Sequence, residues 1–461
     1  MTISRIARSV PFAASLAGLV WGCTIETTTI VPAGSDAGAL DSGELTPGDA
    51  AKGDAGKGKS CVTTITGSVY DPAGKNPLYN VMVYVPAREL DPIATGPSCD
   101  ERCGALPAGL AESATLSNAK GEFTLTTKSV AADAKEASIV IQTGKWRRRI
   151  TLPSIEPCRN NVIANHDLTR LPKSQAEGNV PRIALVTSPL ETPECLLRKM
   201  GIADTEFTGS GGGQDAGTGA GRVHIFKSNG GGTAAGGSLG SRALYESKST
   251  LFNYDMVYLG CEAQEPYNDT GTSSGIEAVA RAAIYDYANA GGRLLTSHFG
   301  YYWLKYGPQG PNGNFRSTAA WVTSSPFSSS FTIETSFPKG QAFSDWLGAV
   351  SATATPGTIA LKDTRDDVGV VGPGTTAWIK GATATSATKA FSFNTPVGTA
   401  APQACGRVTF TDVHVGSTDT PATFPLGCTT PEMSPQEKAL EFLFFDLACV
   451  MDDTQAPPTP Q

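Results

Sequence analysis

The residues of this chain that could carry out chemistry lie at the ends of two strand-like segments. Ser297 follows the apolar run that begins at Arg293, and Asp412 and His414 end the run that begins at Arg407. A serine acts as a nucleophile when a histidine removes its proton and an acid orients that histidine. Residues two apart on a strand share a face, so Asp412 and His414 are expected to act together. These three residues form a candidate catalytic set for a hydrolase, with Glu262 as the alternative orienting acid.

Two other interpretations use the same residues. His298, His414, Asp412 and Glu262 have the side-chain types of a metal site, but nothing in their spacing requires them to converge. Alternatively, the two histidines are hydrogen-bonded residues that line a closed crevice, and Ser297 is a turn residue. We favour this last interpretation, because Ser297 lacks the G-x-S-x-G pattern of a nucleophile elbow. No metal and no cofactor is expected.

Aromatic residues directly follow this candidate set. Tyr301 and Trp303 come after the strand end that holds His298. Aromatic side chains in a crevice suit a sugar or peptide ligand, although packing in the core is their more common use. Glu262, His298, Tyr301 and Trp303 are therefore candidate binding residues.

The segments that must position these residues alternate between apolar strands and amphipathic helices. Strands are expected over 182–187, 255–260, 293–298 and 407–414. Helices are expected after Thr192-Pro193, after the capping box that begins at Ser274, and after the capping box that begins at Ser434. This alternation predicts an α/β three-layer domain with a mainly parallel sheet over residues 181–452. Residues 453–461 are expected to be a disordered tail.

This second region resembles class I glutamine amidotransferase-like (flavodoxin-like) domains, including the branch related to trehalose-utilisation proteins. The resemblance lies in YDMVYLGCE (254–262), YANAGGRLLTSHFGYYW (287–303) and CGRVTFTDVHV (405–415), with insertions at 208–243 and 305–400. It implies a nucleophile, usually cysteine, in the turn at 296–300, and a later His-x-Glu pair. This chain has no cysteine in that turn, and its acid precedes its histidine. The resemblance therefore implies a catalytically degenerate crevice.

An all-β sandwich is expected before this region, over residues 61–172. Short strand-like segments there are separated by turns, such as Asp71-Pro72-Ala73-Gly74 and Asn118-Ala119-Lys120-Gly121. The segment resembles the carboxypeptidase regulatory-like (transthyretin-like) domain in G-x-V-x-D-x-x-G at 67–74 and in NAKGEF at 118–123. That resemblance implies an accessory module without catalysis.

The N-terminus has the order of a secretory signal. Arg5 and Arg8 precede an apolar run from Val10 to Val20, which Cys23 follows closely. The stretch resembles a bacterial lipobox, which implies a signal peptide at 1–22 and diacylation of Cys23. Residues 23–60, rich in Ala, Gly, Asp and Ser, are expected to be a disordered tether. The alternatives are an ordinary signal peptide with a chance cysteine or an N-terminal membrane helix. By resemblance, Thr24 after the cysteine favours the outer membrane.

Composition narrows the expected compartment and partners. The chain has 461 residues, a net charge of -7 and 10 cysteines, so nucleic acid is not an expected partner. An oxidising compartment favours disulfides, although connectivity cannot be deduced from sequence. Our guess pairs Cys61 with Cys158, Cys99 with Cys103, and Cys405 with Cys428; zinc is the alternative for Cys99 and Cys103. The expected function is that of a lipid-anchored binding protein for carbohydrate or a cell-envelope partner, and the alternative is the hydrolase.

Overall fold

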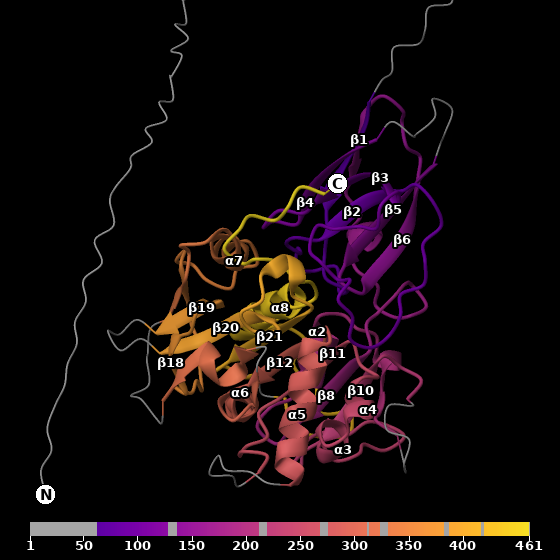
Figure 1. Cartoon of the computed structure of the whole chain (residues 1–461). Coiled ribbons are helices and arrows are strands. Elements are labelled where there is room, and N and C mark those ends of the chain that lie inside the picture. The colour runs from indigo at the N-terminus through magenta and orange to yellow at the C-terminus, as the bar shows by residue number, and fades with distance from the viewer. Residues whose placement is uncertain are drawn as a thin grey trace, which may run out of the picture. The chain divides into compact units, whose positions relative to one another are not determined.

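The computed structural model describes residues 62–127, 136–211, 219–267, 275–310, 313–322, 331–381, 387–415 and 419–460. Residues 59–461 form one compact unit, which is rich in strands (Figure 1). The predicted signal peptide, Cys23 and the predicted tether all lie outside the described residues. None of the described helices is both long and apolar enough to cross a membrane.

Two small sheets form the first part of this unit. The three-stranded sheet has the order β4 (Glu122–Thr127), β1 (Thr63–Ser68), β7 (Asn160–Ile163). The four-stranded sheet has the order β3 (Ala111–Leu116), β2 (Met82–Pro86), β5 (Glu136–Thr143), β6 (Trp146–Pro153), and the short helix α1 (His166–Thr169) follows β7. Side chains alternate between buried and exposed along β4, as a strand with one face on a core requires. The parallel pairing of β7 with β1 was not predicted from the sequence.

A ten-stranded sheet forms the second part, and it is mixed rather than mainly parallel. Its parallel half has the order β9 (Phe207–Gly209), β10 (Val223–Lys227), β8 (Ile183–Thr187), β11 (Met256–Leu259), β12 (Arg293–Ser297), β21 (Gly406–Thr411). Its antiparallel half continues with β20 (Thr388–Thr395), β19 (Thr375–Gly381), β16 (Phe331–Ile333), β17 (Thr358–Ile359). Two separate pairs are β13 (Gln309–Gly310) with β14 (Gly313–Asn314), and β15 (Ala319–Trp321) with β18 (Val368–Val371).

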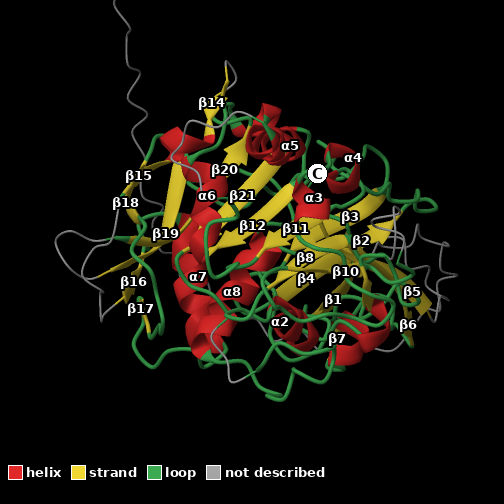
Figure 2. Ribbon diagram, turned by 90° about the horizontal axis from the view of Figure 1, so that it is seen from below, coloured by secondary structure: helices red, strands yellow, loops and turns green. Residues whose placement is uncertain are grey.

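Helices cover both faces of the parallel half (Figure 2). Ile183 and Leu185 of β8 pack with residues of α2 (Pro193–Lys199) and α8 (Pro435–Asp446). The alternate residues of the same strand face the other layer, which contains α3 (Arg242–Tyr245), α4 (Lys248–Leu251), α5 (Ile276–Asn289) and α6 (Tyr301–Lys305). The remaining helices are α7 (Pro338–Ala349), η1 (Asp204–Glu206), η2 (His298–Gly300), η3 (Phe315–Thr318) and η4 (Ala401–Gln403). The parallel strands have continuous apolar sequences because both of their faces are buried.

Both expected insertions contribute to the sheet, which corrects the sequence interpretation. Residues 223–227 lie within the insertion expected at 208–243, and they form the strand β10, in which every residue except Lys227 is buried. Residues 331–395 supply the whole antiparallel half. Alternating glycines and short apolar runs gave too weak a periodicity to show these strands in advance.

The helix ends and the C-terminus follow the predictions only in part. The capping box at Ser434 is confirmed, with Ser434 and Glu437 bonded reciprocally. At α5 the N-cap is Gly275, and Ser274 lies outside the described residues. Ile276 and Val279 of α5, expected in the core, are 51% and 55% exposed. Asp453, expected in a disordered tail, is buried and pairs with Arg407.

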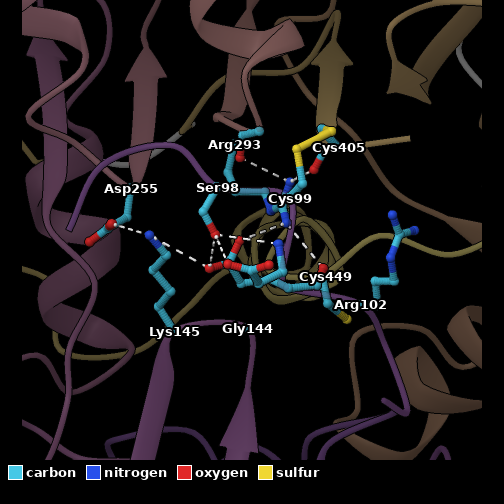
Figure 3. A network of polar contacts seen from close by, with 12 residues as sticks. Ser98, Cys99, Arg102, Gly144, Lys145, Asp255, Arg293, Cys405 and Cys449 are labelled. Carbon is cyan, nitrogen blue, oxygen red and sulfur yellow. Dashed lines mark hydrogen bonds and ion pairs between the residues drawn. A yellow bond between two sulfur atoms is a disulfide. The ribbon is translucent and has the colours of Figure 1, made fainter. Parts of the chain in front are cut away.

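The first part of the unit shares its core with the α/β part. Trp146 of β6 meets Phe445 of α8 edge to face, with ring centroids 5.8 Å apart. Beside this contact, Lys145 pairs with Asp255 at 2.8 Å, and Arg293 of β12 donates to the carbonyl of Cys405 (Figure 3). Both cations are almost fully buried, and both also contact the carboxylate of Glu101, which helps to compensate their charges.

Disulfides reinforce this junction, and their pairing differs from our guess. Cys99 pairs with Cys405 and Cys103 with Cys449, so both bonds join the segment after β2 to the α/β part (Figure 3). The third bond joins Cys195 of α2 to Cys428. The guessed pairs Cys99–Cys103 and Cys405–Cys428 are therefore wrong, and Cys61 of the remaining guess lies outside the described residues. Such bonds are typical of an oxidising, extracytoplasmic compartment.

Candidate functional site

Glu191 joins the carboxyl ends of the central parallel strands. It lies in the loop between β8 and α2 and is 1% exposed. Its Oε1 accepts hydrogen bonds from the hydroxyl of Tyr258 at 2.7 Å and from the backbone N–H of Val415 at 3.1 Å. Its Oε2 accepts from the backbone N–H of Cys261 and the hydroxyl of Ser297. The carboxylate therefore ties together the segments that end β8, β11, β12 and β21.

Ser297, the predicted nucleophile, is the last residue of β12 and is fully buried. Its hydroxyl donates to Oε2 of Glu191 at 2.5 Å. A hydroxyl has a single proton, so this contact leaves none to donate to His414. The structure thus brings Ser297 to a carboxylate that the sequence did not single out.

His298 and His414 form a hydrogen-bonded pair beside Ser297. Nε2 of His298 and Nδ1 of His414 lie 2.8 Å apart, and the two rings meet edge to face. Burial, together with His414 and Arg365, lowers the pKa of His298 to about 2, so this ring is neutral. A hydrogen bond to the backbone of Asp363 opposes this shift of the pKa, because it favours the protonated ring.

One ring of the pair donates and the other accepts, and which ring donates depends on the tautomers. His298 has φ +45°, a left-handed conformation that is uncommon for a residue with a Cβ. Such strain concentrates at functional sites.

Asp412 does not act with His414 as the sequence suggested. β21 ends at Thr411, so the alternation expected through His414 does not hold. Oδ2 of Asp412 instead accepts a hydrogen bond from the backbone N–H of Asp367 at 3.0 Å. The backbone N–H of Asp412 donates to the backbone carbonyl of Lys389. Burial raises the pKa of Asp412 well above its usual range, and Asp367 raises it further.

Glu262 and Trp303 are both buried, and both lie next to Tyr245. Glu262 is 3% exposed and accepts from the hydroxyls of Ser228 and Ser241, and burial raises its pKa. Trp303 is 1% exposed and packs in the core with its ring 4.6 Å from that of Tyr245. Neither side chain meets the histidine pair in this arrangement, so the four predicted metal ligands do not converge. Among the described residues, no group of three or more His, Cys, Asp or Glu is placed to hold a metal ion.

Arg365 lies at the exposed side of the histidine pair, next to Tyr301. Its guanidinium donates twice to the carboxylate of Asp367, at 2.6 and 2.9 Å. The guanidinium carbon lies 4.3 Å from the ring centroid of Phe299 and 5.8 Å from that of Tyr301. The hydroxyl of Tyr301 donates to Glu265. Arg365 is therefore a fixed cation over aromatic rings, and a third of its side chain is exposed.

Cys261 supplies a free thiol at this edge of the sheet, and the thiol is fully buried. Burial and the nearby Glu191 raise its pKa to about 12, although backbone N–H groups of Ala263 and Phe299 oppose this shift. A thiol that keeps its proton is a poor nucleophile.

Sequence reasoning missed Glu191 and Arg365. Glu191 lies in the loop that follows β8, so the rule that ligands gather at the carboxyl ends of parallel strands could have pointed to it. Arg365 belongs to a segment interpreted as an insertion, and no sequence signal placed it near His298. Comparison with protein-family models finds no match for this chain, and comparison with curated proteins finds no relative.

Proposed function

We propose that this chain is a lipid-anchored, extracytoplasmic binding protein whose amidotransferase-like crevice has no catalytic nucleophile. The crevice lies at the carboxyl ends of β12 and β21, beside His298 and His414. The proposed ligand is a carbohydrate or a cell-envelope partner. In this proposal the first part of the chain is a carboxypeptidase regulatory-like sandwich that serves as an accessory module.

The observation that supports binding most directly is the fixed position of Arg365. Asp367 holds its guanidinium in a bidentate pair, and Phe299 lies beneath it at 4.3 Å. A cation that is already ordered loses little conformational entropy when a ligand binds. Partly exposed His414 adds a second polar group at the same strand ends. Polar groups next to aromatic faces suit hydroxyl-rich ligands.

The absence of catalysis is supported by what occupies the nucleophile positions. Ser297 directs its only proton to Glu191, and Cys261 is a buried thiol with a raised pKa. Amidotransferase chemistry needs an activated nucleophile in the turn after the central strand. The disulfides support the extracytoplasmic side of the proposal.

The test is binding of a soluble form lacking residues 1–60 to glycan and peptide arrays. The wild-type protein is expected to bind specific spots on the arrays, and Arg365→Ala is expected to lose this binding. Lys380→Ala is the matched control, because Lys380 is also ion-paired and 38% exposed but belongs to the antiparallel strand β19. Covalent labelling by a fluorophosphonate that disappears in Ser297→Ala would instead support the hydrolase alternative.

A further inference from the structure

A lysine and two aspartates form a closed cluster inside the ten-stranded sheet region. Lys389 lies near the start of β20, and Asp412 follows β21 directly opposite it, since Ala390 pairs with Thr411. Asp366 comes from the segment that leads into β18. Lys389 and Asp412 are fully buried, and the side chain of Asp366 is 1% exposed. Three segments that are separate in sequence therefore place an amine and two carboxyl groups together without solvent.

The polar contacts of this cluster are unusual for an ion pair. Nζ of Lys389 contacts Oδ1 of Asp366, and Nζ also donates to the backbone carbonyl of Arg365. Among the described residues, neither carboxylate oxygen of Asp366 has a hydrogen-bond partner, and Oδ1 of Asp412 has none either. The contact between Lys389 and Asp366 is thus close but lacks hydrogen-bond geometry. A buried carboxylate without hydrogen-bond donors is unfavourable, because nothing replaces the water that it has lost.

Other buried lysines in the chain show what an ordinary pair looks like. Lys339 is fully buried and pairs with Asp453 at 2.7 Å, and Asp453 also accepts from Arg407 and Ser392. Lys199 pairs with Asp419 and Glu437. Asp419 additionally accepts two backbone N–H groups, and Glu437 accepts one. Those carboxylates are stabilised as anions by several donors, whereas Asp366 is not.

We propose that Lys389 and Asp366 are joined by an intramolecular isopeptide bond, and that Asp412 is the acid that promotes its formation. This bond accounts for the carboxylate oxygens of Asp366 that lack hydrogen-bond partners. An amide has no carboxylate charge to stabilise, and it keeps a single carbonyl oxygen where Asp366 had two. Asp412, which faces Lys389 across the strand pair, is placed to hydrogen bond that oxygen through its own unpartnered Oδ1.

The reaction balances without an oxidant or a cofactor. The uncharged amine of Lys389 attacks Cγ of the protonated Asp366 carboxyl group, and a C–N bond forms. Asp412 in its protonated form donates a hydrogen bond to the carbonyl oxygen under attack, as a general acid does. The C–O bond to the hydroxyl breaks, and that hydroxyl leaves as water with a proton from the amine. The products are one secondary amide and one water molecule.

The protonation states favour this step. Burial lowers the pKa of Lys389 to about 8, although Asp412 opposes the shift, so an uncharged fraction of the amine exists near neutral pH. Burial and then Asp367 raise the pKa of Asp412 well above its usual range, so this acid keeps its proton. Lysines take part in covalent chemistry when burial deprotonates them in this way.

The test is tryptic peptide mapping of the purified full chain after reduction, alkylation and denaturation. The sequence places Asp366 in peptide 366–380 and Lys389 within 381–407. The linked protein is expected to give one branched product of these two peptides, lighter than their sum by one water molecule and uncleaved after Lys389. Cleavage after Lys339 and Lys199 is expected to be normal, which makes them internal controls.

Two variants test the formation of the covalent bond separately from the folding of the chain. Lys389→Arg keeps the positive charge but cannot form the amide, so its peptide 381–389 is expected in linear form. Asp412→Asn keeps the size of the side chain but removes the acid, and it is expected to lower the linked fraction at least several-fold. Linear peptides 381–389 and 390–407 from the wild type, with an unmodified Lys389, would overturn the proposal whether or not the variants fold.

Discussion

The hydroxyl of Ser297 donates to Oε2 of Glu191 at 2.5 Å, and the Glu191 carboxylate receives four hydrogen bonds in all from the ends of β11, β12 and β21. This contact determines what Ser297 can do. Ser297 lies in the turn where the sequence resemblance predicted a nucleophile, but its proton is already donated to a buried acceptor. Glu191 therefore holds the strand ends together rather than activating Ser297.

Glu191→Ala is expected to destabilise the protein strongly, because it leaves Tyr258, Cys261, Ser297 and Val415 with unpaired buried donors. A buried donor without a partner costs about 1 to 3 kcal/mol. The free energy of unfolding, measured in urea, is expected to fall by at least about 3 kcal/mol. Glu432→Ala is the control, because Glu432 is 78% exposed in its pair with Lys75 and such pairs contribute about 1 kcal/mol or less. Equal losses in the two variants would contradict this role.

The thiol of Cys261 is expected to be inert in the folded protein. Its pKa of about 12 leaves almost no thiolate at pH 8, and the side chain is fully buried. Iodoacetamide at pH 8 without reductant is expected to modify Cys261 only after denaturation, as measured on the peptide that contains it. Modification of the native protein at a comparable rate would show that the thiol is accessible and activated.

Asp71 is expected to make stability depend on pH. Burial raises its pKa from 3.8 to about 6, next to Glu441, whose pKa burial also raises. The folded state therefore binds the proton of Asp71 more tightly than the unfolded state does. The stability that Asp71 contributes consequently falls as pH rises from about 4 to 6. Asp71→Asn removes the titration and keeps the acceptor for the N–H of Lys75.

The free energy of unfolding of Asp71→Asn, relative to that of the wild type, is expected to rise by up to about 3 kcal/mol between pH 4 and pH 7, because each pKa unit corresponds to about 1.36 kcal/mol. Urea unfolding at the two pH values measures the difference. The exposed variant Glu432→Gln serves as a control for general charge effects. A stability difference between Asp71→Asn and the wild type that does not change with pH would rule out this assignment.

Cys23→Ala tests the proposed anchor. Because acylation needs the thiol, the variant is expected to leave the membrane fraction or to remain as an unprocessed precursor. Fractionation and mass measurement of the N-terminal peptide distinguish these outcomes from normal processing. Unchanged membrane retention with cleavage at another site would refute the lipid anchor.

The sequence was sufficient for the parts of the fold that depend on local pattern. The apolar runs around Ile183, Val257 and Leu294 are parallel strands because both of their faces are buried. The capping box at Ser434 formed as predicted because all of its hydrogen bonds are local.

Relationships between distant segments could not be predicted in this way. Cys99 and Cys405 are separated by 306 residues, and only the folded arrangement brings them together. Arg365 reaches Phe299 for the same reason, and Glu191 accepts donors from segments up to 224 residues away. Ser297, His298 and His414 could be singled out from the sequence as candidates, but the groups that hold them depend on tertiary contacts.

The most direct test of the proposed function is the affinity of the soluble form for the ligand retained on the arrays, measured by titration calorimetry for the wild type and for Arg365→Ala. A hydrogen bond to a charged group contributes about 1.5 to 3 kcal/mol, so the variant is expected to bind at least about tenfold more weakly. Lys380→Ala is expected to bind like the wild type. Equal affinity of Arg365→Ala and the wild type, or a wild type that retains no ligand on the arrays, would contradict the proposal that this crevice is a binding site.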